Sequence, residues 1–316
     1  MNQAITSPRE LSERLGATGY LCDEALATVG FLALELHRPL LVEGEPGTGK
    51  TALAEALAET LGVSLIRLQC YEGIDASQAL YDWDFPRQIL HLRAVEAAGQ
   101  LGHTSERPCY AHPASTSGQP ASRSGSVVSD LERSLFDERF LLARPLLRAL
   151  QESPAVLLVD EVDRADDEFE AFLLEVLSTY QVSIPELGTI SASTPPVVIV
   201  TSNRTREVHD ALKRRCLYHW VDHPGLAREV EIVRTRAPEV SQALASQVVG
   251  LVQQLRTADL VKPPGVAETL DWARALERLG VATLDVEMAA ATLGAVVKYR
   301  EDAERVRASL DRMLAG

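Results

Sequence analysis

The sequence has 316 residues, and its 31 Lys and Arg against 45 Asp and Glu give a formal net charge of −14. Hydrophobic residues make up 46% and charged residues 24%, an ordinary globular composition that excludes a wholly disordered, collagen-like or coiled-coil chain. The acidic balance argues against a nucleic-acid-binding role, because phosphate binding requires a basic surface. The length fits two domains or one large one.

The cysteine spacing and the lack of long apolar runs bear on the compartment. The four cysteines form no C-x-x-C pair, which is typical of reduced cytosolic thiols. The first residues lack the apolar core of a signal peptide, and no apolar run reaches the ~18–20 residues that span a bilayer. We therefore expect a cytoplasmic protein without a membrane span.

The first part of the chain alternates between helical and strand patterns. Residues 1–38 carry apolar side chains at helical spacing, and the apolar residues 40–42 predict a strand that ends at the sequence GEPGTGKT. Leucines at every fourth position from Leu53 to Leu61 predict a helix, and residues 64–69 predict a second strand.

The middle of the chain changes composition abruptly. Residues 111–129 are dominated by Ser, Ala, Gly and Pro and contain no acidic or aromatic residue, so they bury too little apolar surface to order themselves. We interpret residues from about 103 to 130 as a flexible surface insertion, with a substrate-binding loop as the alternative. A helix is expected around 131–150.

Strand patterns return beyond the insertion. The apolar residues 156–159 predict a central strand buried on both faces, and a helix with an apolar stripe follows. Residues 181–191 predict a β-hairpin, and the runs 197–200 and 217–221 predict two further strands. From about residue 225 only helical patterns remain. We expect an α/β domain over 1–225 and an all-α domain over 226–316.

The sequence GEPGTGKT matches the P-loop pattern G-x-x-x-x-G-K-[ST] at every defined position. Glycines let backbone amides converge on phosphate oxygens, and the following helix adds its positive N-terminus. In this interpretation Lys50 contacts the β- and γ-phosphates, and the Thr51 hydroxyl binds Mg²⁺. The predicted ATP-binding residues here are Gly44, Glu45, Pro46, Gly47, Thr48, Gly49, Lys50 and Thr51.

Three further positions are candidates for the chemistry of phosphate-bond cleavage. Asp160 and Glu161 directly follow the strand 156–159. We expect Asp160 to be a second Mg²⁺ ligand and part of the cofactor site, and Glu161 to act as general base for the attacking water. A solvated acidic turn or helix cap is the alternative. The strand 197–200 leads to Asn203, whose amide would orient that water, although Asn is also a common turn residue.

A run of three cations precedes the last predicted strand. Lys213, Arg214 and Arg215 form either an ordinary solvated face or a source of positive charge for the γ-phosphate of a neighbouring subunit. Because the protein is otherwise acidic, we favour the second interpretation, with Arg215 as the first choice and Arg214 as the reserve.

These segments resemble an AAA+ ATPase of the MoxR family, and within it the CoxD-like accessory ATPases of carbon monoxide dehydrogenase maturation. The resemblance covers most of residues 20–225 and rests on GEPGTGKT, ALYDWDFPRQILHLRA, VLLVDEVDRADDEFEAFLLEVLSTYQVSIPELGTI and VVIVTSNRTREVHDALKRRCLYHW. It implies an α/β P-loop fold: an αβα sandwich with a five-stranded parallel sheet in the order 5-1-4-3-2 and a C-terminal all-α lid. It also implies a hexameric ring, with Asn203 as sensor 1 and Arg215 as the arginine finger acting in trans.

The same resemblance implies a chaperone-like remodelling ATPase that uses ATP and Mg²⁺. Relatives act alongside a von Willebrand factor A domain partner, and the CoxD-like branch is associated with the metal centre of a molybdenum hydroxylase, the implied client. A nucleotide-gated scaffold with little hydrolysis is the alternative function. A DNA-acting motor is disfavoured by the acidic charge, and the P-loop leaves ATP and GTP both open because it contacts phosphates only.

Some residues depart from the family pattern, and others have more than one possible role. Thr269 stands where the family has a sensor 2 arginine, and Arg274 is a weak substitute. Tyr81 and Trp83 either grip a client polypeptide or cover the core. A metal-carrier site at His103, Cys109 and His112 is disfavoured, because no fourth ligand is near. We interpret the other histidines, including His219, as ordinary packed or surface residues.

Overall fold

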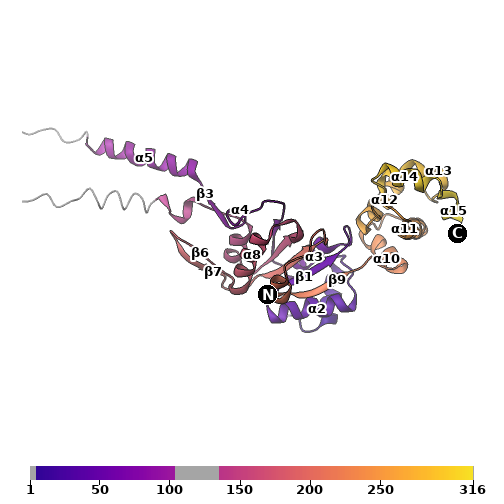
Figure 1. The fold of residues 1–316 in the computed structure, drawn as a ribbon, viewed down its shortest axis with the longest axis horizontal. Coiled ribbons are helices and arrows are strands. Elements are labelled where there is room, and N and C mark those ends of the chain that lie inside the picture. Colours follow the sequence, from indigo (N-terminus) through magenta and orange to yellow (C-terminus); the bar gives the residue numbers. More distant parts are fainter. Residues whose placement is uncertain (1–4, 104–134, 316) are drawn as a thin grey trace, which may run out of the picture.

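The computed structural model describes residues 5–103 and 135–315, and its centre is a five-stranded parallel sheet (Figure 1). The strands lie in the order β2-β5-β8-β1-β9, and every neighbouring pair is parallel. These strands are β1 (Leu40–Gly44), β2 (Ser64–Gln69), β5 (Ala155–Asp160), β8 (Val197–Ser202) and β9 (Leu217–Val221). The labels skip numbers because β3, β4, β6 and β7 form two separate small sheets. Numbered among themselves, the five read 5-1-4-3-2 from the β9 edge.

Helices cover both faces of this sheet. Along β5, Val156 and Leu158 pack in one core, and Leu157 and Val159 pack in the other. Both faces are therefore buried, which is why the strand reads as a continuous apolar run. The first core includes α1 (Pro8–Ala17), α2 (Glu24–Leu36) and α3 (Lys50–Leu61), and the second includes α4 (Ala76–Leu80), α7 (Pro145–Gln151), α8 (Asp167–Thr179) and α9 (Asp210–Arg215). The αβα sandwich is the predicted fold class.

The expected helix around 131–150 is wrong over much of its length. Residues 138–140 form the 3₁₀ turn η1 (Glu138–Phe140), and β4 (Leu141–Ala143) pairs antiparallel with β3 (Tyr81–Trp83). The helix α7 starts only at Pro145. Proline disfavours helical backbone in the residue before it, and Arg144 is extended. The strand pairing across sixty residues is not visible in the local pattern.

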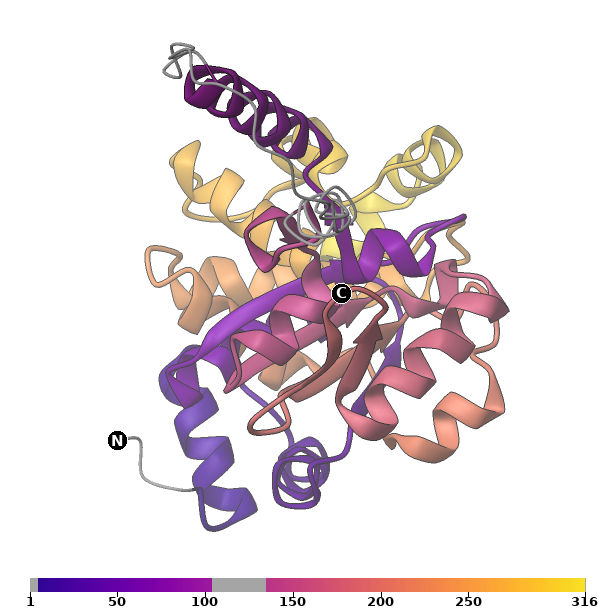
Figure 2. The ribbon, with the colours of Figure 1, turned by 90° about the vertical axis from the view of Figure 1, so that its left-hand side faces the viewer.

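Two further features belong to this domain. The helix α5 (Phe85–His103) extends away from the body of the molecule next to β3 (Figures 1 and 2). The hairpin of β6 (Gln181–Ile184) and β7 (Gly188–Ser191) is antiparallel, as the sequence predicts. Beyond His103, the predicted insertion lies outside the described residues.

The chain after β9 is helical and has a core of its own around the fully buried Trp272. Its elements are α10 (Leu226–Arg236), α11 (Gln242–Thr257), α12 (Val266–Arg278), α13 (Val286–Thr292), η3 (Leu293–Ala295), α14 (Arg300–Arg307) and α15 (Leu310–Ala315). The helical pattern expected beyond residue 225 therefore takes the form of several separate helices, the last of them short. Within the described ranges, no helix has both the length and the hydropathy needed to cross a membrane.

Candidate nucleotide and metal site

The P-loop connects β1 to α3 as the spacing predicts. Gly47 and Gly49 have φ of 78° and 92°, the left-handed region that glycine adopts without strain. A Cβ on Gly44 would lie 2.3 Å from the carbonyl oxygen of Val221, so only glycine fits there. Because α3 begins at Lys50, its free amides and positive end face the loop.

Lys50 lies inside this loop. Its side chain is buried, and Nζ donates to the carbonyl oxygens of Gly44 at 2.8 Å and Glu45 at 2.7 Å. Burial lowers the pKa of Lys50 below its ordinary value, while the neighbouring acids, Asp163 first, oppose that shift. A phosphate anion in the loop would favour the charged ammonium.

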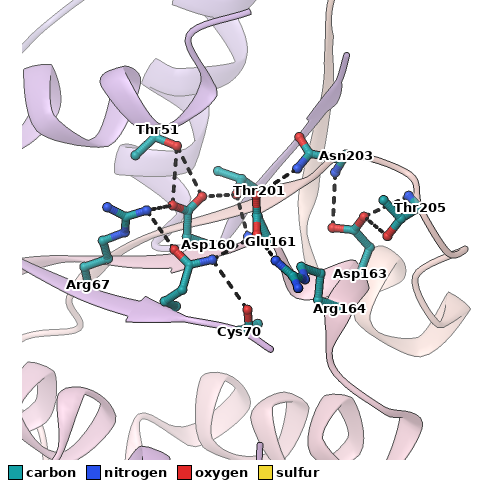
Figure 3. A network of polar contacts seen from close by, with 11 residues as sticks. Thr51, Arg67, Cys70, Asp160, Glu161, Asp163, Arg164, Thr201, Asn203 and Thr205 are labelled. Carbon is teal, nitrogen blue, oxygen red and sulfur yellow. Dashed lines mark hydrogen bonds and ion pairs between the residues drawn. The ribbon is translucent and has the colours of Figure 1, made fainter. Parts of the chain in front are cut away.

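Asp160 is the centre of a polar network (Figure 3). It is 3% exposed and accepts hydrogen bonds from Thr201 Oγ1 at 2.6 Å, Thr51 Oγ1 at 3.2 Å and Arg67 Nη2 at 2.5 Å. The structure thus brings the two predicted Mg²⁺ ligands, Thr51 and Asp160, into direct contact. A hydroxyl and a carboxylate are oxygen ligands that suit Mg²⁺ beside phosphates, so the donor set fits this ion.

Glu161 and Asn203 also meet. Asn203 Nδ2 donates to Glu161 Oε1 at 3.2 Å, and Gln69 Nε2 donates to Glu161 Oε2 at 3.1 Å. Glu161 has φ of 55°, an unusual backbone for a residue with a side chain, and its amide donates to Thr201 Oγ1 at 2.9 Å. Strain of this kind gathers at functional sites.

Asp163 supports the loop that follows β8, a role that the sequence pattern did not predict. It is 3% exposed and accepts from the amide of Asn203 at 3.1 Å, from the amide of Thr205 at 2.8 Å and from Thr205 Oγ1 at 2.6 Å. The signal was a third acid, in VDEVD, directly after a buried strand. Asp163 therefore fixes the loop that carries Asn203.

A cavity of about 730 Å³ opens beside these groups, large enough for a nucleotide. The P-loop, Asp160, Glu161 and Asn203 line one side. The other side consists of residues from the α1–α2 loop, the start of α2, β9 and the segment after it, α10 and α12; it includes Tyr20, Cys22, Leu26, His219, His223, Ile232 and Leu270. His219 is one of the residues that line the cavity. Burial lowers its pKa.

The helical part contributes cations that the sequence did not indicate. Thr269 is fully buried and donates to Glu229 Oε1 at 2.8 Å, and Arg274 donates to the carbonyl oxygen of Arg236. Among the described residues that line the cavity, the cations from α10 are instead Arg228 and Arg236. Neither Thr269 nor Arg274 therefore fills the expected sensor 2 place.

Arg215 lies elsewhere, at the C-terminal end of α9. It donates to Ser178 Oγ, and the carbonyl oxygens of Arg214 and Arg215 accept from Arg38. Of the cavity-lining residues in the described part, none belongs to α9. The structure does not bring Arg215 to the site of its own chain.

The structure bears on two further sets of sequence candidates, the aromatic pair and the metal-carrier residues. Tyr81 and Trp83 pack edge to face with ring centroids 6.1 Å apart and lie against the main core, contacts that match the covering interpretation. Cys109 and His112 fall outside the described residues, as does the side chain of His103. Within the described ranges, no group of three His, Cys, Asp or Glu has the geometry of a metal site.

The P-loop, the acid pair and the parallel sheet define a P-loop nucleotide-binding protein. Residues 40–220, more than half of the chain, match the family described as ATPase family associated with various cellular activities (AAA). The chain belongs to this family of ATPases.

The other likenesses are either short or low in sequence identity. Midasin of Giardia intestinalis is 50% identical over 48 residues, which is 15% of this chain and 1% of that protein. The RuvB Holliday junction branch migration motor of Thermotoga maritima has 15% sequence identity and a TM-score of 0.41, over 90% of this chain and 67% of that one. A RuvB mutant has 14% identity and a TM-score of 0.44, over 92% and 70%.

Proposed function

We propose that this protein is an Mg²⁺-dependent ATPase that uses hydrolysis to move its helical domain and thereby remodels a client protein. The observation that carries the proposal is the convergence of Thr51, Asp160, Glu161 and Asn203 at one end of the cavity. We assign residues 1–225 to the nucleotide-binding domain and 226–316 to the lid. Because α10 and α12 line the same cavity, the bound nucleotide would contact both.

Each residue has a definite task in this mechanism. The P-loop amides and Lys50 hold the phosphates, and Thr51 and Asp160 would hold the metal ion. Bound Mg²⁺ neutralises phosphate charge. Glu161 accepts a proton from water, and the amide of Asn203, 3.2 Å from the Glu161 carboxylate, keeps both in position.

We further propose that the site is completed between subunits. Arg215 binds Ser178 of α8 and does not line the cavity of its own chain, which suits a residue that acts on a neighbour's γ-phosphate. A ring, hexameric by the MoxR resemblance, would place it there. ATP hydrolysis then depends on assembly.

The client is proposed on the resemblance to the MoxR family and its CoxD-like branch. That resemblance favours a cytoplasmic chaperone role in building the metal centre of a molybdenum hydroxylase, with a von Willebrand factor A domain protein as partner. The support consists of the motifs around Asp160 and Asn203.

The test measures the ATPase rate per subunit across a range of protein concentrations, with Glu161→Gln as the paired variant. We expect a rate that rises with concentration and saturates, and a variant that binds ATP without turnover. Tight ATP binding by the wild type with no turnover at any concentration would favour a nucleotide-gated scaffold. Turnover retained by Glu161→Gln would remove Glu161 from the role of base.

A further inference from the structure

Arg67 has no part in the mechanism above, yet it contacts the proposed metal ligand. It lies on β2, whose residue Gln69 is paired in register with Asp160 of β5. Arg67 Nη2 donates to Asp160 Oδ2 at 2.5 Å (Figure 3), and it also donates to Gln69 Oε1 at 2.7 Å. The guanidinium therefore joins the carboxylate to a neighbouring amide.

The burial of the two partners differs sharply. The Asp160 side chain is 4% exposed, whereas the Arg67 side chain is 53% exposed. A buried carboxylate needs a counter-ion, because an unpaired charge out of water is strongly unfavourable. Arg67 supplies that charge across the edge of the sheet, since β2 is an edge strand.

The same carboxylate is the proposed ligand of Mg²⁺, together with Thr51. A guanidinium and a divalent cation on one carboxylate repel each other, and low local dielectric strengthens that repulsion. Arg67 is half exposed and has a long flexible side chain, so its guanidinium can turn into solvent. Asp160 cannot move in this way, because Thr51 and Thr201 also hold it.

We propose that Arg67 is a displaceable counter-ion of Asp160, which yields the carboxylate to the metal ion that arrives with the nucleotide and so sets the metal affinity of the site. The inference rests on the proposed function, because it concerns the same Mg²⁺-nucleotide site. Arg67 is a positioning residue: it acts through Asp160.

The exchange also has a consequence for Glu161. Gln69 accepts from Arg67 through Oε1 and donates to Glu161 Oε2 through Nε2. When Arg67 leaves Asp160, the amide of Gln69 loses one of the contacts that orient it. The binding of a metal ion at Asp160 is thereby linked to the mobility of the Glu161 side chain.

The test uses Mn²⁺ as the probe and detects its binding to the full chain by electron paramagnetic resonance, with saturating ADP. Arg67→Ala removes the competing cation, so we expect Mn²⁺ to bind about tenfold more tightly than to the wild type. Melting in EDTA should occur at a lower temperature in the variant, with recovery on addition of Mn²⁺, because Asp160 then lacks a counter-ion. Arg67→Gln provides the same readouts if Arg67→Ala fails to fold.

Arg164→Ala is the matched control, since Arg164 is 55% exposed and lies 3.3 Å from Glu161, not Asp160. Its Mn²⁺ affinity should stay within about twofold of the wild type, because direct competition at Asp160 is unaffected. Equal affinity in wild type and Arg67 variants, weaker binding in those variants, or an equal gain in Arg164→Ala would overturn the inference. Absence of any ADP-dependent Mn²⁺ binding by the wild type would instead refute the proposed function.

Discussion

The carbonyl oxygen of Gly47 accepts a hydrogen bond of 2.9 Å from the amide of Val266, which joins the P-loop directly to the first residue of α12. Behind this bond the two backbones approach closely: a Cβ on Gly265 would lie 2.8 Å from Gly47 Cα and 2.9 Å from the carbonyl oxygen of Pro46. The helical domain is therefore attached to the phosphate-binding loop through main-chain contact, without a side-chain cation from α12.

The first prediction concerns Gly265→Ala. Gly265 has φ of −87°, which alanine adopts freely, so the substitution tests only the close approach to the P-loop. The added methyl group must push α12 away from Gly47. We expect ADP affinity, measured by calorimetry, to fall about tenfold or more, while the helical circular dichroism is unchanged.

Gly250→Ala serves as its control. Gly250 lies in α11, and a Cβ there meets no heavy atom within 4 Å. Helix propensity alone would stabilise this variant by about 1 kcal/mol, and nucleotide affinity should match the wild type. Equal ADP affinities in both glycine variants and the wild type would contradict the role assigned to the contact.

The second prediction concerns a buried ion pair that stiffens the helical domain. Arg256 donates to both carboxylate oxygens of Glu229, at 2.6 Å and 2.7 Å, and the Glu229 side chain is fully buried. Arg256→Met would leave that charge unpaired and reduce the free energy of unfolding by about 3–5 kcal/mol.

Urea unfolding measures this loss of stability. Glu229→Gln is the second single variant, and it removes the other charge of the pair. The double variant, Glu229→Gln with Arg256→Met, should recover at least half of the loss because no buried charge remains. A double variant as unstable as Arg256→Met would show that packing around Arg256, and not its charge, dominates.

How much the sequence predicts depends on whether a feature is local. The P-loop follows from glycine spacing between a strand and a helix, so its residues could be placed without the structure. The convergence of Asp160 and Asn203 follows too, because parallel strands end at one edge of a sheet. The pairing of β4 with β3 depends on contacts across sixty residues and overrides the helical pattern near residue 141.

The rest of the site depends on contacts between side chains that cannot be predicted from the sequence pattern. Arg67 looks like an ordinary polar residue of an edge strand, and only the register between β2 and β5 brings it to Asp160. In the same way, the sequence shows only that Thr269 stands where an arginine is expected, whereas the structure shows that its hydroxyl donates to Glu229.

The third prediction concerns Asp163, which fixes the loop that carries Asn203 through three hydrogen bonds. Asp163→Ala removes a buried charged acceptor and should lower the free energy of unfolding by about 2–3 kcal/mol. ATP turnover should fall at least tenfold while ATP affinity changes little, because Asn203 loses its position. The control is Asp167→Ala, whose carboxylate is largely exposed. Unchanged turnover in Asp163→Ala would mean that Asn203 does not depend on this support.

The fourth prediction concerns pH and His223, in the segment between β9 and α10. Burial lowers the pKa of His223, helped by the positive Arg256 and opposed by Glu229, Glu45 and Asp222. Within the described residues, its Nδ1 is buried and has no hydrogen-bond partner. The unfolded chain, with an ordinary histidine pKa near 6.5, therefore binds the proton more readily than the folded one.

Below about pH 6.5 this difference favours unfolding, so stability contributed by neutral His223 is present at pH 7.5 and is lost as the pH falls. His223→Gln should reduce the fall in melting temperature between pH 7.5 and 5.5. Part of the fall remains, because burial also lowers the pKa of His219. An identical pH profile for wild type and variant would exclude His223 as a source of acid sensitivity.

The last prediction tests whether Arg215 acts on a neighbouring subunit. An Arg215→Ala subunit keeps its own Glu161, and a Glu161→Gln subunit keeps its own Arg215. Each variant alone should lose ATP turnover by about a hundredfold or more, because one lacks the cation and the other the base. Mixed in equal amounts and allowed to exchange, they should regain up to about a quarter of wild-type activity, the share of random contacts between intact partners.

Arg214→Ala mixed with Glu161→Gln decides between the two arginines, which are adjacent at the end of α9. If Arg215 is the acting residue, Arg214→Ala alone keeps most of its turnover. Failure of the Arg215→Ala mixture to regain activity, in subunits that exchange freely, would contradict a site shared between chains. Regain by the Arg214→Ala mixture alone would transfer the role to Arg214, since only the missing cation can be supplied from a neighbour.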